Sequence, residues 1–130
     1  GDVYKRQVPV KPYLISGITA PFGLTVRSGH TWTGDRLLKA ATAEKLKEYM
    51  RYNVSNYYGD GLFPDLAVCA KTGTAEVGGG KKPNGWMVGF SSSEKTPLAF
   101  AVVVENSRSG ISSAGQIASA LMTAAAKTLK

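Results

Sequence analysis

The stretch of sequence that carries the most information about this chain is Lys71-Thr72-Gly73-Thr74-Ala75-Glu76, which follows an apolar segment. Successive side chains of an extended strand point to opposite faces, so Thr72 and Thr74 share a face on which two hydroxyls can bind a carboxylate together. Lys71 falls on the opposite face of an ideal strand. Gly73 has no side chain, and a ligand can therefore approach the backbone closely at this position.

The position of this strand within a sheet decides what its residues can do. On an edge strand, the long stem of Lys71 and the twist of the strand let the ammonium group reach the face that holds the two threonines. An edge strand also keeps unpaired N–H groups, which can bind an extended peptide as an added strand or stabilise an oxyanion. A bare Lys-Thr-Gly tripeptide, however, equally fits a surface strand with a solvated lysine and β-favouring threonines.

The surrounding residues predict an antiparallel sheet. Residues 66–77 and 86–90 are predicted as two strands, joined by a glycine-rich hairpin over 78–84. Residues 98–104 are all apolar, a pattern typical of a central strand that is covered on both faces. Earlier in the chain, residues 8–26 are apolar but interrupted by Pro and Gly, which predicts short extended pieces with turns.

Two amphipathic helices are predicted to flank this sheet. The first begins after Thr42 as the N-cap, with Glu44 in the first turn, where the helix dipole favours an acid. The second begins near Ser113, which forms an S-x-x-Q capping box with Gln116. The fold class is therefore α/β in the broad sense (α+β), an antiparallel sheet flanked by helices. The chain has little left to cover the second face of the central strand, which indicates a piece of a larger domain.

Composition and charge exclude several functional classes. The chain has 16 Lys and Arg against 9 Asp and Glu, a formal net charge of +7, and 43% hydrophobic residues, as in ordinary globular proteins. The single cysteine, Cys69, excludes an internal disulfide and is interpreted as a core thiol, and no Cys or His cluster predicts a metal site or another cofactor. No apolar run approaches the roughly 18 residues of a membrane helix. No nucleic-acid partner is expected, because helix packing accounts for the tyrosines near Arg51; salt-dependent duplex binding would indicate otherwise.

The similarity to a known family extends well beyond the Lys-Thr-Gly tripeptide. Cys69 to Glu76, the glycine-rich hairpin and Trp86-Met87-Val88-Gly89-Phe90 together resemble the transpeptidase domain of penicillin-binding proteins, whose fold is shared with serine β-lactamases. The apolar strand that closes in Glu105-Asn106, the C-terminal helix and the upstream Lys11-Pro12-Tyr13-Leu14-Ile15 fit the same family. Ala75-Glu76 after the motif is more similar to the class B group than to class A.

This resemblance implies a role for each residue of the motif. Lys71 would lie beside the nucleophile, where its charge favours the substrate carboxylate and assists proton transfer. The hydroxyls of Thr72 and Thr74 would bind that carboxylate, the backbone N–H of Thr74 would be one donor of the oxyanion hole, and Gly73 would leave room for the ligand.

The nucleophile of the family is absent from this sequence. In the family the motifs S-x-x-K and S-x-N precede K-T-G, and residues 8–70 contain neither. Ser92-Ser93-Glu94-Lys95 has the right spelling but follows K-T-G in a polar turn, whereas such a nucleophile needs a helix N-terminus with the lysine one turn later. Residues 8–130 are therefore interpreted as the C-terminal portion of a transpeptidase domain, and residues 1–7, which show no pattern, as an assembly junction.

The function that the resemblance implies is that of a peptidoglycan D,D-transpeptidase. A serine takes the penultimate D-alanyl carbonyl of a D-Ala-D-Ala stem peptide, D-alanine leaves and an amine accepts the acyl group; β-lactams mimic the peptide end. The implied partners are the stem peptide, β-lactams, the N-terminal part of the same domain and a glycosyltransferase. The parent protein would be membrane-anchored at the extracytoplasmic face of the bacterial cell membrane, and the chain alone would be inactive.

Two alternatives stay open at this stage. One is a β-lactamase or β-lactam-sensor domain of the same fold, which the upstream motif regions would distinguish because a hydrolase needs a base for the deacylating water. The other is a non-catalytic cell-wall binding module that keeps the K-T-G strand without a nucleophile.

Overall fold

A computed structural model describes residues 9–129 of the chain. It divides into two compact units, Gly1–Lys45 and Leu46–Lys130, which are described separately. The junction predicted over residues 1–7 lies outside the described residues. No helix within residues 9–129 combines the length and the apolar character needed to cross a membrane.

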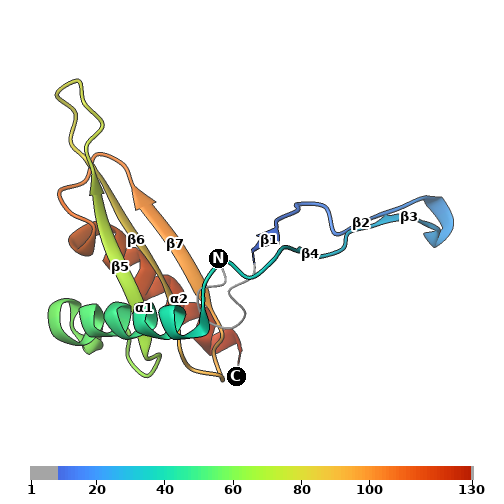
Figure 1. The fold of residues 1–130 in the computed structure, drawn as a ribbon. Coiled ribbons are helices and arrows are strands. Elements are labelled where there is room, and N and C mark those ends of the chain that lie inside the picture. Colours follow the sequence, from blue (N-terminus) through green and yellow to red (C-terminus); the bar gives the residue numbers. More distant parts are fainter. Residues whose placement is uncertain (1–8, 130) are drawn as a thin grey trace. The chain divides into compact units, whose positions relative to one another are not determined.

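The first unit consists of two small antiparallel ribbons (Figure 1). Strand β1 (Val10–Lys11) pairs with β4 (Trp32–Thr33), and β2 (Gly17–Thr19) pairs with β3 (Thr25–Ser28). A 3-10 turn at Pro21–Gly23 joins β2 to β3. The prediction of short extended pieces with turns is thus confirmed, since proline and glycine limit how far each strand can run.

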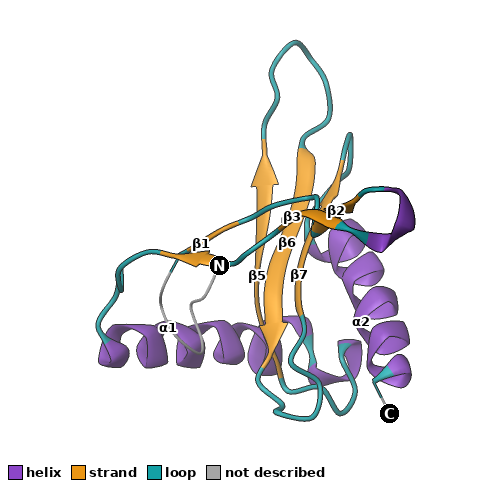
Figure 2. Cartoon of the chain, turned by 90° about the vertical axis from the view of Figure 1, so that its right-hand side faces the viewer, coloured by secondary structure: helices purple, strands orange, loops and turns teal. Residues whose placement is uncertain are grey.

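The second unit is built on a three-stranded antiparallel sheet in the order β5-β6-β7 (Figures 1 and 2). Its strands are β5 (Val68–Ala75), β6 (Asn84–Ser91) and β7 (Ala99–Val104). The connection between β5 and β6 contains three glycines in the left-handed region, Gly78, Gly79 and Gly80. The predicted hairpin and both of its strands are therefore confirmed, with boundaries shifted by up to two residues.

One face of this sheet packs against helix α2 (Gln116–Thr128). Met87 in the central strand is completely buried, and it pairs with Thr72 on one side and Val102 on the other. Small residues on α2, such as Ala118 and Ala126, let the helix approach the sheet closely. The hydrophobic core between them contains Met87 and Val102 together with Val54, Phe63, Leu66, Val68, Ala70, Ala114, Ala118, Met122 and Ala126.

The prediction of a central strand over residues 98–104 is wrong for the described chain. Strand β7 lies at an edge of its sheet, and within the described residues only one of its faces is packed. On the other face Val103 is 45% exposed, beside Trp86 at 41% and Val88 at 42%. A uniformly apolar strand tolerates cover on both faces, but its own sequence does not supply the second layer.

The first of the two helices begins earlier than predicted. Helix α1 (Ala40–Asn53) begins two residues before Thr42, whose N–H donates to the carbonyl of Lys39 at 3.0 Å. Thr42 is therefore not the N-cap, and Glu44 lies beyond the first turn, which contains no acid. A π-helical turn, Val54–Tyr58, follows α1 directly.

The capping box predicted at the C-terminal helix is also wrong. A π-helical turn, Ile111–Gly115, precedes α2 and contains Ser113. The Ser109 hydroxyl accepts the Ser112 N–H at 3.2 Å, so the serine that caps an N–H group before α2 lies four residues before the one predicted. The Ser113 hydroxyl donates to the Ser107 hydroxyl at 3.0 Å.

Candidate functional site

The motif Lys71-Thr72-Gly73-Thr74 lies on β5, the strand at the other edge of the sheet. The N–H of Thr72 donates to the hydroxyl of Tyr58 at 3.1 Å, so it points away from β6. In an antiparallel pair the outward-pointing residues alternate along the strand. The N–H of Thr74 therefore also points to the outer edge of β5.

The same edge receives the side chain of Lys71. Lys71 pairs with Val88 on the face of the sheet opposite Thr72. Its Nζ nevertheless donates to the carbonyl of Thr72 at 2.6 Å, and that carbonyl points to the same side of the strand as the Thr72 N–H. The lysine thus bends around the outer edge, where its ammonium group joins the N–H and the hydroxyl of Thr72.

The two threonines differ in their surroundings. The Thr72 side chain is half-buried, and its Oγ1 lies 3.0 Å from the Tyr58 hydroxyl. Thr74 is exposed. From the sequence, Tyr58 is one of the tyrosines near Arg51 for which packing is predicted, and no local pattern links it to a strand 14 residues later.

Gly73 and Gly110 differ in the room that their surroundings leave for a side chain. A Cβ on Gly73 would meet only the Cβ of Trp86, at 3.5 Å, so the described structure leaves room for a side chain there. A Cβ on Gly110 would lie 2.5 Å from the Trp86 carbonyl oxygen and 2.8 Å from that of Gly73. Gly110 therefore lets the turn before α2 rest directly on β5 and β6.

The S-x-x-K sequence at Ser92 to Lys95 lies outside this arrangement. It follows β6 in a turn, and the Ser92 hydroxyl donates to the carbonyl of Ala67 at 2.7 Å. The interpretation of this segment as a turn is confirmed. Cys69 is completely buried, as expected of a core thiol.

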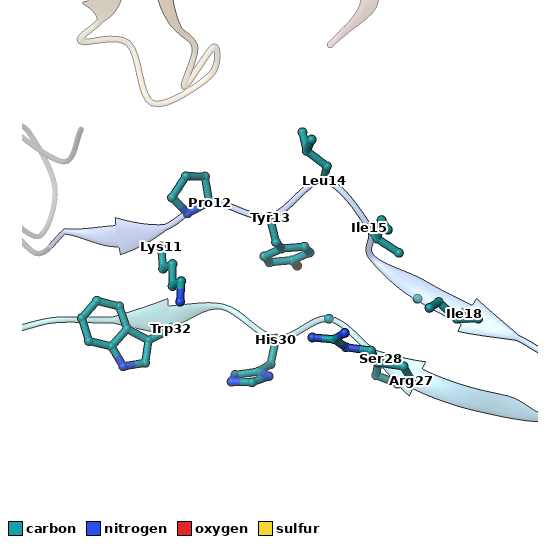
Figure 3. A pocket seen from close by; sticks show the side chains of 12 residues that line it. Lys11, Pro12, Tyr13, Leu14, Ile15, Ile18, Arg27, Ser28, His30 and Trp32 are labelled. Atoms are coloured by element: carbon teal, nitrogen blue, oxygen red, sulfur yellow. The ribbon is translucent and has the colours of Figure 1, made fainter.

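A separate hollow of about 760 Å³ lies in the first unit, lined by residues from the segments 11–18 and 27–32 (Figure 3). Aromatic and cationic side chains line it, among them Tyr13, Trp32, Lys11, Arg27 and His30. None of the residues predicted for the site from the sequence belongs to it.

A family model described as "Penicillin binding protein transpeptidase domain" matches residues 3–123. Over 111 residues the chain is 27% identical to the peptidoglycan D,D-transpeptidase PbpA of Mycobacterium tuberculosis, in strains CDC 1551 / Oshkosh and ATCC 25618 / H37Rv. That alignment covers 83% of this chain but only 23% of the length of these relatives.

Solved structures give the same result for the fold. Penicillin-binding protein A from M. tuberculosis matches in its ceftriaxone acyl-enzyme complex with a TM-score of 0.79 and 26% identity, over 92% of this chain and 28% of that one. Its imipenem acyl-enzyme complex matches with a TM-score of 0.70 and 28% identity, over 88% and 27%. The D,D-transpeptidase domain of a peptidoglycan glycosyltransferase from Eggerthella lenta shares the fold, with a TM-score of 0.78 at 22% identity over 98% and 30%.

These matches confirm both the predicted fold class and the resemblance drawn from the K-T-G segment. The chain belongs to the penicillin-binding protein transpeptidase family.

Proposed function

We propose that strand β5 is the substrate-binding edge of a peptidoglycan D,D-transpeptidase that works by serine acyl transfer. The observation that carries this proposal is the outer edge of β5. There the Thr72 N–H donates to Tyr58, the N–H of Thr74 points to the same side, and Lys71 bends around to it. An open strand edge with outward N–H groups can hold an extended peptide as an additional strand.

Each residue of the motif has a role in this proposal. The hydroxyls of Thr72 and Thr74 bind the terminal carboxylate of the substrate, and the outward N–H of Thr74 donates to the oxyanion that forms during acyl transfer. Lys71 adds positive charge and assists proton transfer near the reacting serine. Gly73, where the fold itself leaves room for a side chain, keeps space for the ligand.

The nucleophile comes from an upstream part of the same domain that carries S-x-x-K and S-x-N. Its serine attacks the penultimate D-alanyl carbonyl of a stem peptide, an ester forms and D-alanine leaves. An amine of a neighbouring stem peptide then attacks the ester and releases the serine. The 130-residue chain on its own is inactive in this proposal, because it supplies the binding edge without the serine.

β-Lactams are the second class of ligand. They present a carboxylate beside a reactive carbonyl, and the proposed edge offers donors for both groups. Solved relatives are described as acyl-enzyme complexes with ceftriaxone, imipenem and penicillin G, which supports this assignment. The parent protein is proposed to be membrane-anchored on the extracytoplasmic side of the cell membrane and to act with a glycosyltransferase.

The test begins with the source DNA upstream of the codon for Val8. An in-frame S-x-x-K followed by S-x-N is expected. Their absence would contradict the proposal and favour a non-catalytic binding module, and rapid hydrolysis of the β-lactam adduct would mark a β-lactamase instead.

Fluorescent penicillin then tests the site itself. The longer protein should form a covalent adduct and the 130-residue chain none. Lys71→Ala should slow adduct formation by roughly 100-fold or more, as expected for loss of a group that assists proton transfer. Lys95→Ala, on an exposed turn residue, is the matched control and should react at the original rate. Equal rates for both variants, or an adduct on Ser92, would contradict the assignment.

A further inference from the structure

Tyr58 makes two contacts with Thr72 of the motif. Its hydroxyl accepts the backbone N–H of Thr72 at 3.1 Å and lies 3.0 Å from Thr72 Oγ1. The two residues are 14 positions apart, on separate elements. The backbone N–H and the side-chain hydroxyl of Thr72 therefore both meet one phenol.

The fold itself places this phenol. Tyr58 ends the π-helical turn Val54–Tyr58, which is closed by a hydrogen bond of 2.8 Å from the Gly59 N–H to the Val54 carbonyl. Val54 is completely buried, and the half-buried ring of Tyr58 packs against the same core. The hydroxyl is thus held against β5 by packing at both ends of the turn.

The Tyr58 and Thr72 hydroxyls lie 3.0 Å apart, and either can donate to the other. A phenol has one proton to donate and also accepts hydrogen bonds. In the arrangement that serves a ligand, the Tyr58 oxygen accepts the Thr72 N–H and donates its own proton to Thr72 Oγ1. The hydroxyl proton of Thr72 is then left to be donated to a ligand. Hydrogen bonds in such a chain strengthen one another.

The same contact also limits how a substrate can pair with β5. The phenol occupies the outward N–H of Thr72, so the next outward N–H along the strand, that of Thr74, is the one left for an extended peptide. A peptide shifted by two residues toward Thr72 would have to displace the phenol.

We infer that Tyr58 is a positioning residue that acts through Thr72: it directs the Thr72 hydroxyl toward the substrate carboxylate and fixes the register of the substrate on β5. This inference rests on the proposed function, in which Thr72 binds that carboxylate.

The test compares Tyr58→Phe with Tyr57→Phe in the longer protein that carries the upstream serine. Tyr57 is 73% exposed and makes an edge-to-face contact with Tyr52, so it is a matched control. The rate of acylation is measured with a penicillin that has its free carboxylate and with the methyl ester of the same penicillin. Tyr58→Phe should slow the acid about three- to tenfold, the loss expected for one hydrogen bond, and leave the ester unchanged. An equal loss with both compounds would indicate general damage and overturn the inference.

A double-mutant cycle with Thr72→Val separates the two proposals. In the Thr72→Val background Tyr58→Phe should have no further effect on the acid. If Thr72→Val slows the acid but the effect of Tyr58→Phe persists beside it, the inference fails and the proposed function stands. If Thr72→Val leaves acylation by the acid unchanged, the proposed role of Thr72 fails and the inference fails with it.

A measurement on the unsubstituted 130-residue chain needs no variant to fold. Amide hydrogen exchange should be slow at Thr72, whose N–H is held by the phenol, and fast at Thr74. Equal exchange at the two amides would overturn the inference.

Discussion

At the scale of single residues, the motif shows how one strand can bring side chains from both of its faces to one edge. Strict alternation separates Lys71 from Thr72, yet the lysine Nζ reaches the Thr72 carbonyl at 2.6 Å. This reach agrees with the prediction for an edge strand, because a four-carbon stem can span a strand. Tyr58 could not be anticipated in the same way, since only the π-helical turn brings it to β5.

A prediction about stability belongs to this scale. Gly110→Ala should destabilise the chain by about 1–3 kcal/mol, because the new Cβ would meet the carbonyl oxygens of Trp86 and Gly73, and backbone cannot easily move aside. The midpoint and slope of urea denaturation measure this change. Gly61→Ala is the control, since a Cβ there meets nothing within 4 Å. Equal midpoints for the two variants would show that the turn before α2 does not press on the sheet.

At the scale of elements, the hairpin of β5 and β6 was predictable and the starts of the helices were not. The apolar residues of β6 and the glycines between the two strands are local signals that can be read from the sequence. The first turn of a helix depends on which nearby carbonyl or hydroxyl accepts its N–H groups, and several serines compete before α2. Periodicity therefore identified the helix, but the S-x-x-Q pattern placed its start near Ser113, whereas the Ser109 hydroxyl accepts the N–H of Ser112.

This difference leads to a second prediction. Ser109→Ala should cost about 1 kcal/mol of stability, because its hydroxyl accepts the Ser112 N–H in the manner of an N-cap. Gln116→Ala should change stability by less than about 0.5 kcal/mol, as for an ordinary exposed position. Thermal unfolding of both variants measures the contrast. A larger loss for Gln116→Ala would restore the capping box that the sequence predicted.

At the scale of the whole chain, the sequence and the fold show the family, but the chain corresponds to only part of the length of its relatives. The relatives are several times longer, since the aligned region is 23% of their length. Within the described residues, one face of the sheet has no covering layer. This open face is formed by Lys71, Gly73, Trp86, Val88, Ala101 and Val103. A single sequence can indicate that a strand is apolar enough to be covered, but not which segment covers it.

The last prediction concerns this open face in the isolated chain. Adjacent exposed apolar side chains on a sheet promote association, so the chain should self-associate as its concentration rises. Replacing Val88 and Val103 together by threonine should weaken association, because they are 42% and 45% exposed and lie on neighbouring strands. Leu121→Thr, an exposed position on α2, is the control and should change little. Sedimentation velocity over a concentration series measures all three proteins. A chain that stays monomeric throughout, or one in which Leu121→Thr matters as much as the double replacement, would show that the open face does not drive association.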